Sequence, residues 1–324
     1  ATVRAYLDAD LVISCAGNFL YSRGHGAGLP LLGPVFTIAY AWLVGKPVAM
    51  LPQSVGPLWR RWERGLVRWL LGRLHTVLVR DLASVELLER MGVPADQYRL
   101  TPDLAFLYTV PNHEAGRELL CRYGIDPDHQ RPLLGVTLIN WGAQHPIFKE
   151  QVRYEAAVAA AIRHFITAYD GRAVLFAQVC GPTAADDDRI PARRVRAALD
   201  DPQFAGRITV IDEEVSAATL KAAYGCMDLF LGSRLHSNIF TLTEGVPVLA
   251  IAYQDKTFGV LRMLGLDEWV VDIRAVEAGQ LVDLLRRLWA VRAEVRGLIA
   301  QRIGPLQEQA HTAVEWLRNS EGMA

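Results

Sequence analysis

The stretch GSRLHSNIF, residues 232–240, combines two groups that bind or protonate anions. It follows an apolar run and places Arg234 and His236 two residues apart, just before a helix start at Ser237. A guanidinium holds a carboxylate or phosphate through paired N–H groups, and an imidazole titrates near neutral pH. The first amides of a helix favour the same negative charge. We therefore predict an anion-binding site here.

Tyr253 and Lys256 are expected to join this site. Both follow the predicted strand at residues 248–252, and the carboxyl ends of neighbouring parallel strands share one edge of a sheet. Lys256 either reaches the same anion or is a solvated lysine at a helix start. Each charge-assisted contact contributes about 1.5–3 kcal/mol, so three converging cations would dominate the recognition of a small trianion.

Polar residues at the ends of the other predicted strands are further candidates for substrate contacts. Arg80 either binds an anion or pairs with Asp81 or Asp103, and Asp103 either orients a hydroxyl or has a structural role. Asn18 lies in a loop of small residues that suits either a phosphate approach or a plain turn. The strand-end candidates are Asn18, Gln53, Ser54, Arg80 and Asp103 in the first half, and Asn140 and Gln178 in the second.

The three adjacent carboxylates Asp186, Asp187 and Asp188 are expected to start a helix, where the helix dipole favours negative charge. The sequence places neither a histidine nor a second acidic cluster at ligand spacing from them. We therefore predict no metal site.

Short runs of Val, Ile and Leu alternate with amphipathic segments along the chain, which indicates parallel strands joined by crossover helices. The predicted fold is α/β and doubly wound, with two Rossmann-like domains at residues 1–115 and 116–324. The tail from residue 275 reads as two closing helices separated at Gly304-Pro305. The predicted strands are 11–14, 48–51, 76–79, 133–139, 173–178, 207–211, 228–231, 248–252 and 269–272.

Composition excludes several classes of protein. The 34 Lys and Arg nearly balance the 35 Asp and Glu, which gives no electrostatic case for a nucleic-acid partner or an anionic membrane, so any bound anion must be held locally. No apolar run reaches the ~18 residues of a membrane span. The four cysteines lack C-x-x-C spacing and are expected to be reduced, buried thiols. The predicted location is the cytoplasm, with peripheral contact at the inner face of the membrane left open and the oligomeric state unspecified.

An ordered set of motifs resembles the polysaccharide pyruvyltransferase family. The resemblance extends over residues 10–266 and is most specific at SRLHS followed by Y-x-x-K. Its motifs are DLVISCAGNFL, GKPVAMLPQSVGP, VLVRDLASVELLERMGV, TPDLAF, FAQVCGPTAADDD and LFLGSRLHSNIFTLTEGVPVLAIAYQDKTFGVLRMLGL.

The resemblance implies a GT-B-like fold, in which two Rossmann-like domains face each other across a cleft. It implies transfer of a pyruvyl group from phosphoenolpyruvate to a sugar or lipid-linked saccharide, as a ketal, without a cofactor. Arg234, His236 and Lys256 would hold or activate the donor, with Arg80 contributing across the cleft. The first loop and Pro52 depart from the family's glycines, and the first βα unit or units of the family's N-terminal domain are expected before residue 1.

In the implied reaction, His236 is either the proton donor or only a phosphate ligand, and Asp103 is the candidate base. Two other functions remain open. Glu244, before Gly245 and Pro247, suits a glycosyltransferase that binds the ribose of a nucleotide sugar. The altered first loop suits a non-catalytic protein of polysaccharide assembly.

Overall fold

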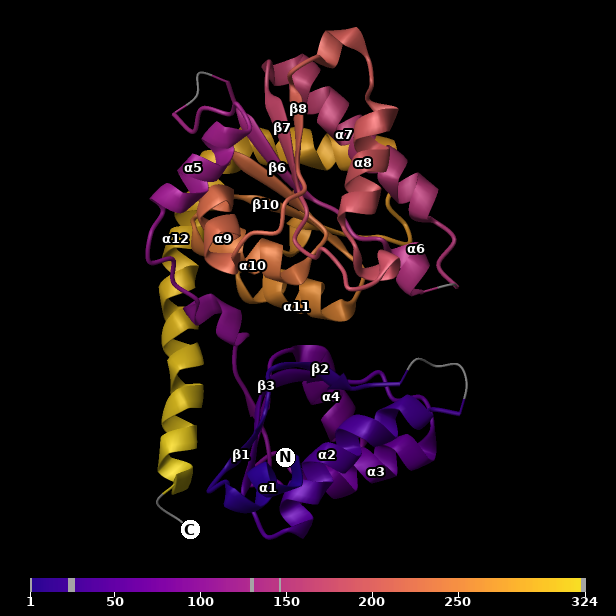
Figure 1. Cartoon of the computed structure of the whole chain (residues 1–324), viewed down its shortest axis with the longest axis vertical. Coiled ribbons are helices and arrows are strands. Elements are labelled where there is room, and N and C mark those ends of the chain that lie inside the picture. Colours follow the sequence, from indigo (N-terminus) through magenta and orange to yellow (C-terminus); the bar gives the residue numbers. More distant parts are fainter. Residues whose placement is uncertain (1, 23–26, 129–130, 146, 322–324) are drawn as a thin grey trace. The chain divides into compact units, whose positions relative to one another are not determined.

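The chain forms two compact units in the computed structural model, which describes residues 2–22, 27–128, 131–145 and 147–321 (Figure 1). The first unit comprises Ala1–Leu107 together with Gly304–Ala324, and the second comprises Tyr108–Ile303. Within the described residues, no helix has both the length and the apolar character that a membrane span requires.

The first unit contains a parallel sheet in the order β1-β3-β4-β5. Its longest strand, β3, pairs with β1 near its start and with β2 near its end, so β1 and β2 follow one another along the same edge. The strands are β1 (Val12–Ser14), β2 (Gly17–Leu20), β3 (Val48–Val55), β4 (Thr76–Val79) and β5 (Arg99–Leu100). The helices before α12 are α1 (Thr2–Asp8), α2 (Leu32–Leu43), α3 (Arg61–Leu71) and α4 (Leu82–Arg90).

The second unit contains a six-stranded parallel sheet in the order β11-β10-β9-β6-β7-β8. Numbered from β6, this is the doubly wound Rossmann order. The strands are β6 (Leu133–Thr137), β7 (Arg172–Phe176), β8 (Ile208–Ile211), β9 (Leu229–Gly232), β10 (Val248–Ala252) and β11 (Val270–Asp272). The helices are α5 (Glu114–Arg122), α6 (Trp141–Gln144), α7 (Gln151–Tyr169), α8 (Arg189–Ala198), α9 (Ala217–Gly225), α10 (Leu235–Thr243), α11 (Asp255–Met263) and the first part of α12 (Ala278–Glu321), whose residues from Gly304 onward belong to the first unit.

The central strands of the second unit are buried on both faces, because helices cover the sheet on each side. Every residue of β6, β9 and β10 is buried, which explains their continuous apolar sequences. Tyr154, Phe165, Phe176 and Phe230 are fully buried in this unit. The predicted α/β class with parallel sheets is therefore confirmed.

The tail is one helix rather than two. Helix α12 continues through Pro305, which lies inside it. A proline within a helix costs about 3 kcal/mol, so the sequence favours a break there. The structure keeps the helix because apolar residues on both sides of the proline are buried, namely Ile299, Leu306 and Ala310.

The unit boundary also differs from the predicted domains 1–115 and 116–324. The chain enters the second unit at Tyr108, whose ring stacks on Phe240 with centroids 5.4 Å apart and whose carbonyl accepts a hydrogen bond from Lys221. The chain returns to the first unit at Gly304. There Gln307 donates to the Phe106 carbonyl at 3.0 Å.

Two local expectations for the first unit and the cysteines are wrong. Asn18 lies on strand β2, not in a loop or turn, because Gly17 and Leu20 pair with β3. Cys15 and Cys121 are exposed rather than buried, although all four cysteines are free thiols.

The contact between α5 and α9 generates a prediction about packing. A Cβ atom on Gly116 would lie 2.4 Å from the backbone of Ala222 and Ala223. Gly116→Ala is therefore expected to lower the free energy of unfolding by about 1–3 kcal/mol, as overpacking does. The control is Gly297→Ala in α12, where nothing lies within 4 Å and a gain of about 0.5–1 kcal/mol is expected. Urea unfolding of both variants checks this, and equal effects would contradict it.

Candidate active site

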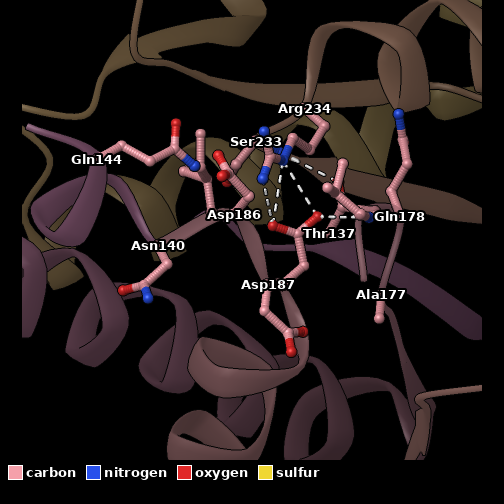
Figure 2. A network of polar contacts seen from close by, with 12 residues as sticks. Thr137, Asn140, Gln144, Ala177, Gln178, Asp186, Asp187, Ser233 and Arg234 are labelled. Carbon is pink, nitrogen blue, oxygen red and sulfur yellow. Dashed lines mark hydrogen bonds and ion pairs between the residues drawn. The ribbon is translucent and has the colours of Figure 1, made fainter. Parts of the chain in front are cut away.

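The candidate site lies where the strand order of the second unit reverses, between β6 and β9. Gly232 on β9 lies opposite Thr137 on β6, and the Ser233 amide donates to the Thr137 carbonyl at 3.1 Å. Helices leave the two strands in opposite directions at such a point, and the crevice outside the carboxyl ends is the usual ligand position. The segment after β9 that carries Arg234 and His236 begins here (Figure 2).

Buried hydroxyl groups fix this segment to β6 and α7. Thr137 Oγ1 and Ser237 Oγ lie 2.7 Å apart, and Ser237 Oγ donates to the Arg234 carbonyl at 2.7 Å. Ser233 Oγ lies 2.7 Å from the hydroxyl of Tyr154, which is fully buried. Burial raises the pKa of the Tyr154 hydroxyl, so it stays protonated as a hydrogen-bond donor. This network holds the start of α10 in place.

Arg234 forms a buried ion pair with Asp188. Its Nη2 lies 2.6 Å from Oδ1 and its Nε lies 3.1 Å from Oδ2, a two-point contact that fixes the guanidinium plane. The Val179 amide also donates to Asp188 at 3.0 Å. The Asp188 side chain is 0% exposed and that of Arg234 is 13% exposed. Figure 2 shows these contacts at Arg234, while the Asp187 carboxylate points away from it.

The ion pair with Asp188 lowers the net positive charge that the sequence predicted for the site. Burial acts to lower the pKa of Arg234, but the neighbouring Asp188 carboxylate outweighs burial and raises it. Arg234 therefore remains charged, and Asp188 balances that charge. Of the three converging cations predicted from the sequence, Arg234 thus has its charge balanced within the protein.

Aromatic side chains connect Arg234 to Lys256. Tyr253 contacts the Arg234 guanidinium, and the Lys256 ammonium lies 5.7 Å from the Tyr253 ring centroid. The centroid of the Tyr253 ring also lies 4.7 Å from that of Trp141, which lies 4.2 Å from that of His145. The structure thus brings together Arg234, Tyr253 and Lys256 as the sequence suggested, beside a face of aromatic rings.

His236 lies in the first turn of α10 and is exposed. Its ring is tilted 37° from that of Phe240, with centroids 6.5 Å apart. Arg234 is the N-cap residue of α10, and its side chain does not cap the helix. The imidazole is therefore accessible from solvent, beside the positive end of a helix.

Asn140 and Gln178 contact protein groups rather than Arg234 in this structure. The Asn140 side chain donates to the Ala184 carbonyl at 2.9 Å and accepts from Arg194 at 3.2 Å. Gln178 accepts from the Tyr224 hydroxyl at 3.4 Å. It also lines a separate pocket of about 390 Å³ together with Glu214 and Leu220.

The first-unit candidates form their own polar cluster at the ends of β3, β4 and β5. Arg80 lies 2.5 Å from Asp103 and donates to Ser54 at 3.1 Å. Both members of the ion pair are at least 96% buried, since their side chains are 4% and 3% exposed. Of the alternatives for Arg80, the ion pair with Asp103 is the arrangement present.

Two amide oxygens near this cluster are buried and have no partner. They are Oδ1 of Asn18 and Oε1 of Gln53, among the described residues. The Gln53 side-chain nitrogen donates to Ser14 at 3.2 Å. Buried polar oxygens without partners are costly, and Asp81 Oδ2 and Thr101 Oγ1 of the same unit share this condition.

The comparison with known families decides where the chain belongs. A family model described as polysaccharide pyruvyl transferase matches residues 2–255, which include Arg234, His236 and Tyr253. The chain belongs to the polysaccharide pyruvyl transferase family. The amylovoran biosynthesis protein AmsJ of Erwinia amylovora is 26% identical over 313 residues, which cover 94% of this chain and 69% of AmsJ.

Solved structures share the fold of this pyruvyl transferase family member. A UDP-forming trehalose-phosphate synthase from Burkholderia xenovorans matches with a TM-score of 0.61 and 14% identity, over 97% of this chain and 74% of its own. The MnaA–UDP structure from S. aureus matches with a TM-score of 0.64 and 10% identity, over 100% of this chain and 79% of the MnaA chain. Anabaena HepE with UDP-glucose matches with a TM-score of 0.56 and 12% identity, over 97% of this chain and 80% of the HepE chain. The predicted GT-B-like fold is confirmed.

Asp188 is the residue of the candidate site whose contact with Arg234 was not predicted from the sequence. The acidic cluster does start a helix, since α8 begins at Arg189 with Asp188 as its N-cap. Asp187 pairs with Arg189 at 2.7 Å, as a solvated helix start would. The signal for Asp188 was its position after β7, a strand adjacent to β6. In the described part of the chain, no group of three or more His, Cys, Asp or Glu residues has the geometry to hold a metal ion.

The buried ion pair generates a prediction about stability. Asp188→Ala leaves the Arg234 charge without its partner, so we expect the free energy of unfolding to fall by about 3–5 kcal/mol. The double variant Asp188→Leu with Arg234→Met should recover most of this loss, because an apolar pair needs no partner. Chemical denaturation measures both.

The control is Glu213→Gln, which breaks the exposed pair with Arg122 at 2.9 Å and should cost less than about 1 kcal/mol. The prediction fails if Asp188→Ala and Glu213→Gln lower stability equally.

Proposed function

We propose that this chain transfers the pyruvyl group of phosphoenolpyruvate to a sugar of a polysaccharide or its precursor, as a ketal that bridges two hydroxyls. The observation that carries the proposal is the family match, which includes the whole segment from Thr137 to Tyr253 and ends one residue before Lys256. The segment's placement at the strand-order reversal supports a small-ligand site there.

The charge of the site supports an anionic donor. Lys256 and the N-terminus of α10 supply positive charge, His236 can supply it when protonated, and Arg234 offers guanidinium N–H groups held by Asp188. A fixed guanidinium stabilises charge that develops on a carboxylate or phosphate without reorganising. In this proposal Arg234 and Lys256 bind phosphoenolpyruvate and His236 is its proton donor or a phosphate ligand.

The reaction balances in bonds and protons. A proton is added to the methylene carbon of phosphoenolpyruvate, and a sugar hydroxyl attacks C2 and loses its proton. The bond between C2 and the phosphate oxygen then breaks, a second hydroxyl attacks C2, and its proton leaves with phosphate. The products are a ketal that carries a methyl and a carboxylate, and inorganic phosphate. The acid must therefore stand near the methylene carbon and the fixed cations near the phosphate.

The first unit supplies candidate groups for the acceptor. The unpartnered amide oxygens of Asn18 and Gln53 suit the hydroxyl donors of a sugar. Asp103 is less suited to act as a base than the sequence suggested, because Arg80 and the Ala105 amide already bind its two oxygens. That AmsJ is named for amylovoran biosynthesis supports an exopolysaccharide or its precursor as acceptor.

A nucleotide-sugar glycosyltransferase is the second candidate, favoured by the UDP complexes of similar fold. Its proposed ribose ligand was Glu244. The structure places Glu244 at the end of α10, which leads into the amino end of β10 rather than leaving a carboxyl end. Glu244 pairs there with Lys221 at 3.4 Å and lies 3.0 Å from His113. This position weakens the glycosyltransferase candidate.

Ligand-induced thermal stabilisation separates these two candidates. Phosphoenolpyruvate at 100 times its dissociation constant should stabilise the folded chain by about 2.7 kcal/mol, because it binds only the folded site. UDP at the same concentration should leave the melting temperature unchanged. A shift with UDP and none with phosphoenolpyruvate would reverse the choice.

Phosphate release tests the chemistry and the role of His236. With phosphoenolpyruvate and a saccharide acceptor, His236→Ala should lower kcat by roughly 100-fold or more if the imidazole is the proton donor. The matched control is His311→Ala, an exposed histidine of α12, which should keep wild-type turnover. A variant at His236 with full activity would remove it from the mechanism, and no phosphate release by the wild type with any acceptor would favour a non-catalytic assembly protein.

A further inference from the structure

Helix α2 exposes apolar residues along one face. The side chains of Leu32, Phe36 and Leu43 are 42%, 64% and 65% exposed. Their spacing of four and seven residues places them on the same side of a helix. Tyr40 lies on this side too, with its ring centroid 6.0 Å from that of Phe36. No charged residue occurs from Ala27 to Gly45, so this face is apolar and uncharged.

Helix α3 and the residues just before it expose tryptophans beside arginines. Trp59, Trp62 and Trp69 are 60%, 40% and 38% exposed. Trp62 and Trp69 are seven residues apart and share one side of α3, and Arg61 and Arg68 are seven apart on the adjoining side.

The two helices are joined at Trp42 and Trp69, whose ring centroids are 5.8 Å apart, with the Arg73 guanidinium over both rings. They lie beside each other in the first unit in Figure 1. We call the combined surface the α2–α3 surface. It consists of Leu32, Phe36, Leu43, Trp59, Trp62 and Trp69 together with Arg61, Arg64, Arg68 and Arg73.

The charge of this surface is positive and nearly uncompensated. Five arginines and one acidic residue, Glu63, lie between Leu58 and His75. Glu63 is 0% exposed and its carboxylate is bound by Arg60 and Ser22. Within the described part of the chain, the four arginines of the α2–α3 surface form no ion pair. The whole chain has a formal charge of -1, so this is a local concentration of positive charge.

We propose that the α2–α3 surface binds the anionic surface of a lipid membrane. Exposed Trp, Phe and Leu side chains enter the boundary between headgroups and acyl chains, while adjacent arginines contact lipid phosphates. The surface has both components on two adjoining helices. This inference rests on the first unit and does not depend on the reaction proposed for the second.

Other anionic or apolar partners fit less well. A second copy of this chain, docked by the same face, would bring its arginines against these arginines, which is repulsive. A nucleic acid would satisfy the arginines and stack on tryptophans, but it offers nothing apolar to Leu32, Phe36 and Leu43. A membrane satisfies both sets of side chains at once.

Vesicle co-sedimentation of the full chain tests the proposal. We expect binding to vesicles of phosphatidylcholine with 30–40% phosphatidylglycerol (roughly the anionic share that gives a strongly negative surface), weakened by salt, and much less binding to pure phosphatidylcholine. Arg61→Gln with Arg68→Gln should weaken binding roughly 25-fold, about fivefold for each arginine. Leu32→Ser with Leu43→Ser should weaken it roughly tenfold with little change in salt dependence.

The matched control is Arg163→Gln with Arg302→Gln, which removes the same charge from exposed positions on α7 and α12 and should bind as the wild type does. Thermal melting verifies that each variant is folded. Equal binding by the control and the Arg61/Arg68 variant would overturn the proposal, as would no binding to anionic vesicles. Self-association lost in the leucine variant, or binding of a single-stranded oligonucleotide as tight as that of vesicles, would assign the surface to another partner.

Discussion

The geometry of the candidate site depends on the ion pair between Arg234 and Asp188. Arg234 follows β9 and Asp188 follows β7, and β6 lies between these two strands. The pair therefore spans the strand after which the order of the sheet reverses. Because both oxygens of Asp188 contact the guanidinium, Arg234 cannot rotate freely toward solvent. Its orientation, and with it the start of α10, is set before any ligand binds.

A network of buried hydroxyl groups also holds the start of α10 in place. Thr137 is the last residue of β6 and faces Gly232, and its hydroxyl lies 2.7 Å from that of Ser237. The Tyr154 hydroxyl on α7 lies 2.7 Å from that of Ser233. Buried polar groups stabilise a fold only when each finds a partner. Here they find one another, so directional bonds hold the turn after β9 in addition to the packing of the buried Leu235.

Much of the fold could be predicted from the sequence, and much of the site could not. The strands were predictable because parallel strands buried on both faces are continuous apolar runs, as at Val248–Ala252. The partner of Arg234 was not, since Asp188 is 46 residues away and only the strand order brings the two together. The continuous helix at Pro305 also depends on tertiary burial that outweighs local propensity.

The charged groups near Arg234 bear on which ligand the candidate site can bind. Since Asp188 balances Arg234, the proposed trianionic donor would rely on Lys256, His236 and the N-terminus of α10 as further groups that can carry positive charge. Of these, Lys256 carries a full fixed charge and the helix end about half of one. A protonated His236 would bring the local charge nearest to that of phosphoenolpyruvate. In the proposed reaction, the imidazole that would complete the binding of phosphoenolpyruvate is also the candidate proton donor, which would link donor binding to the first chemical step.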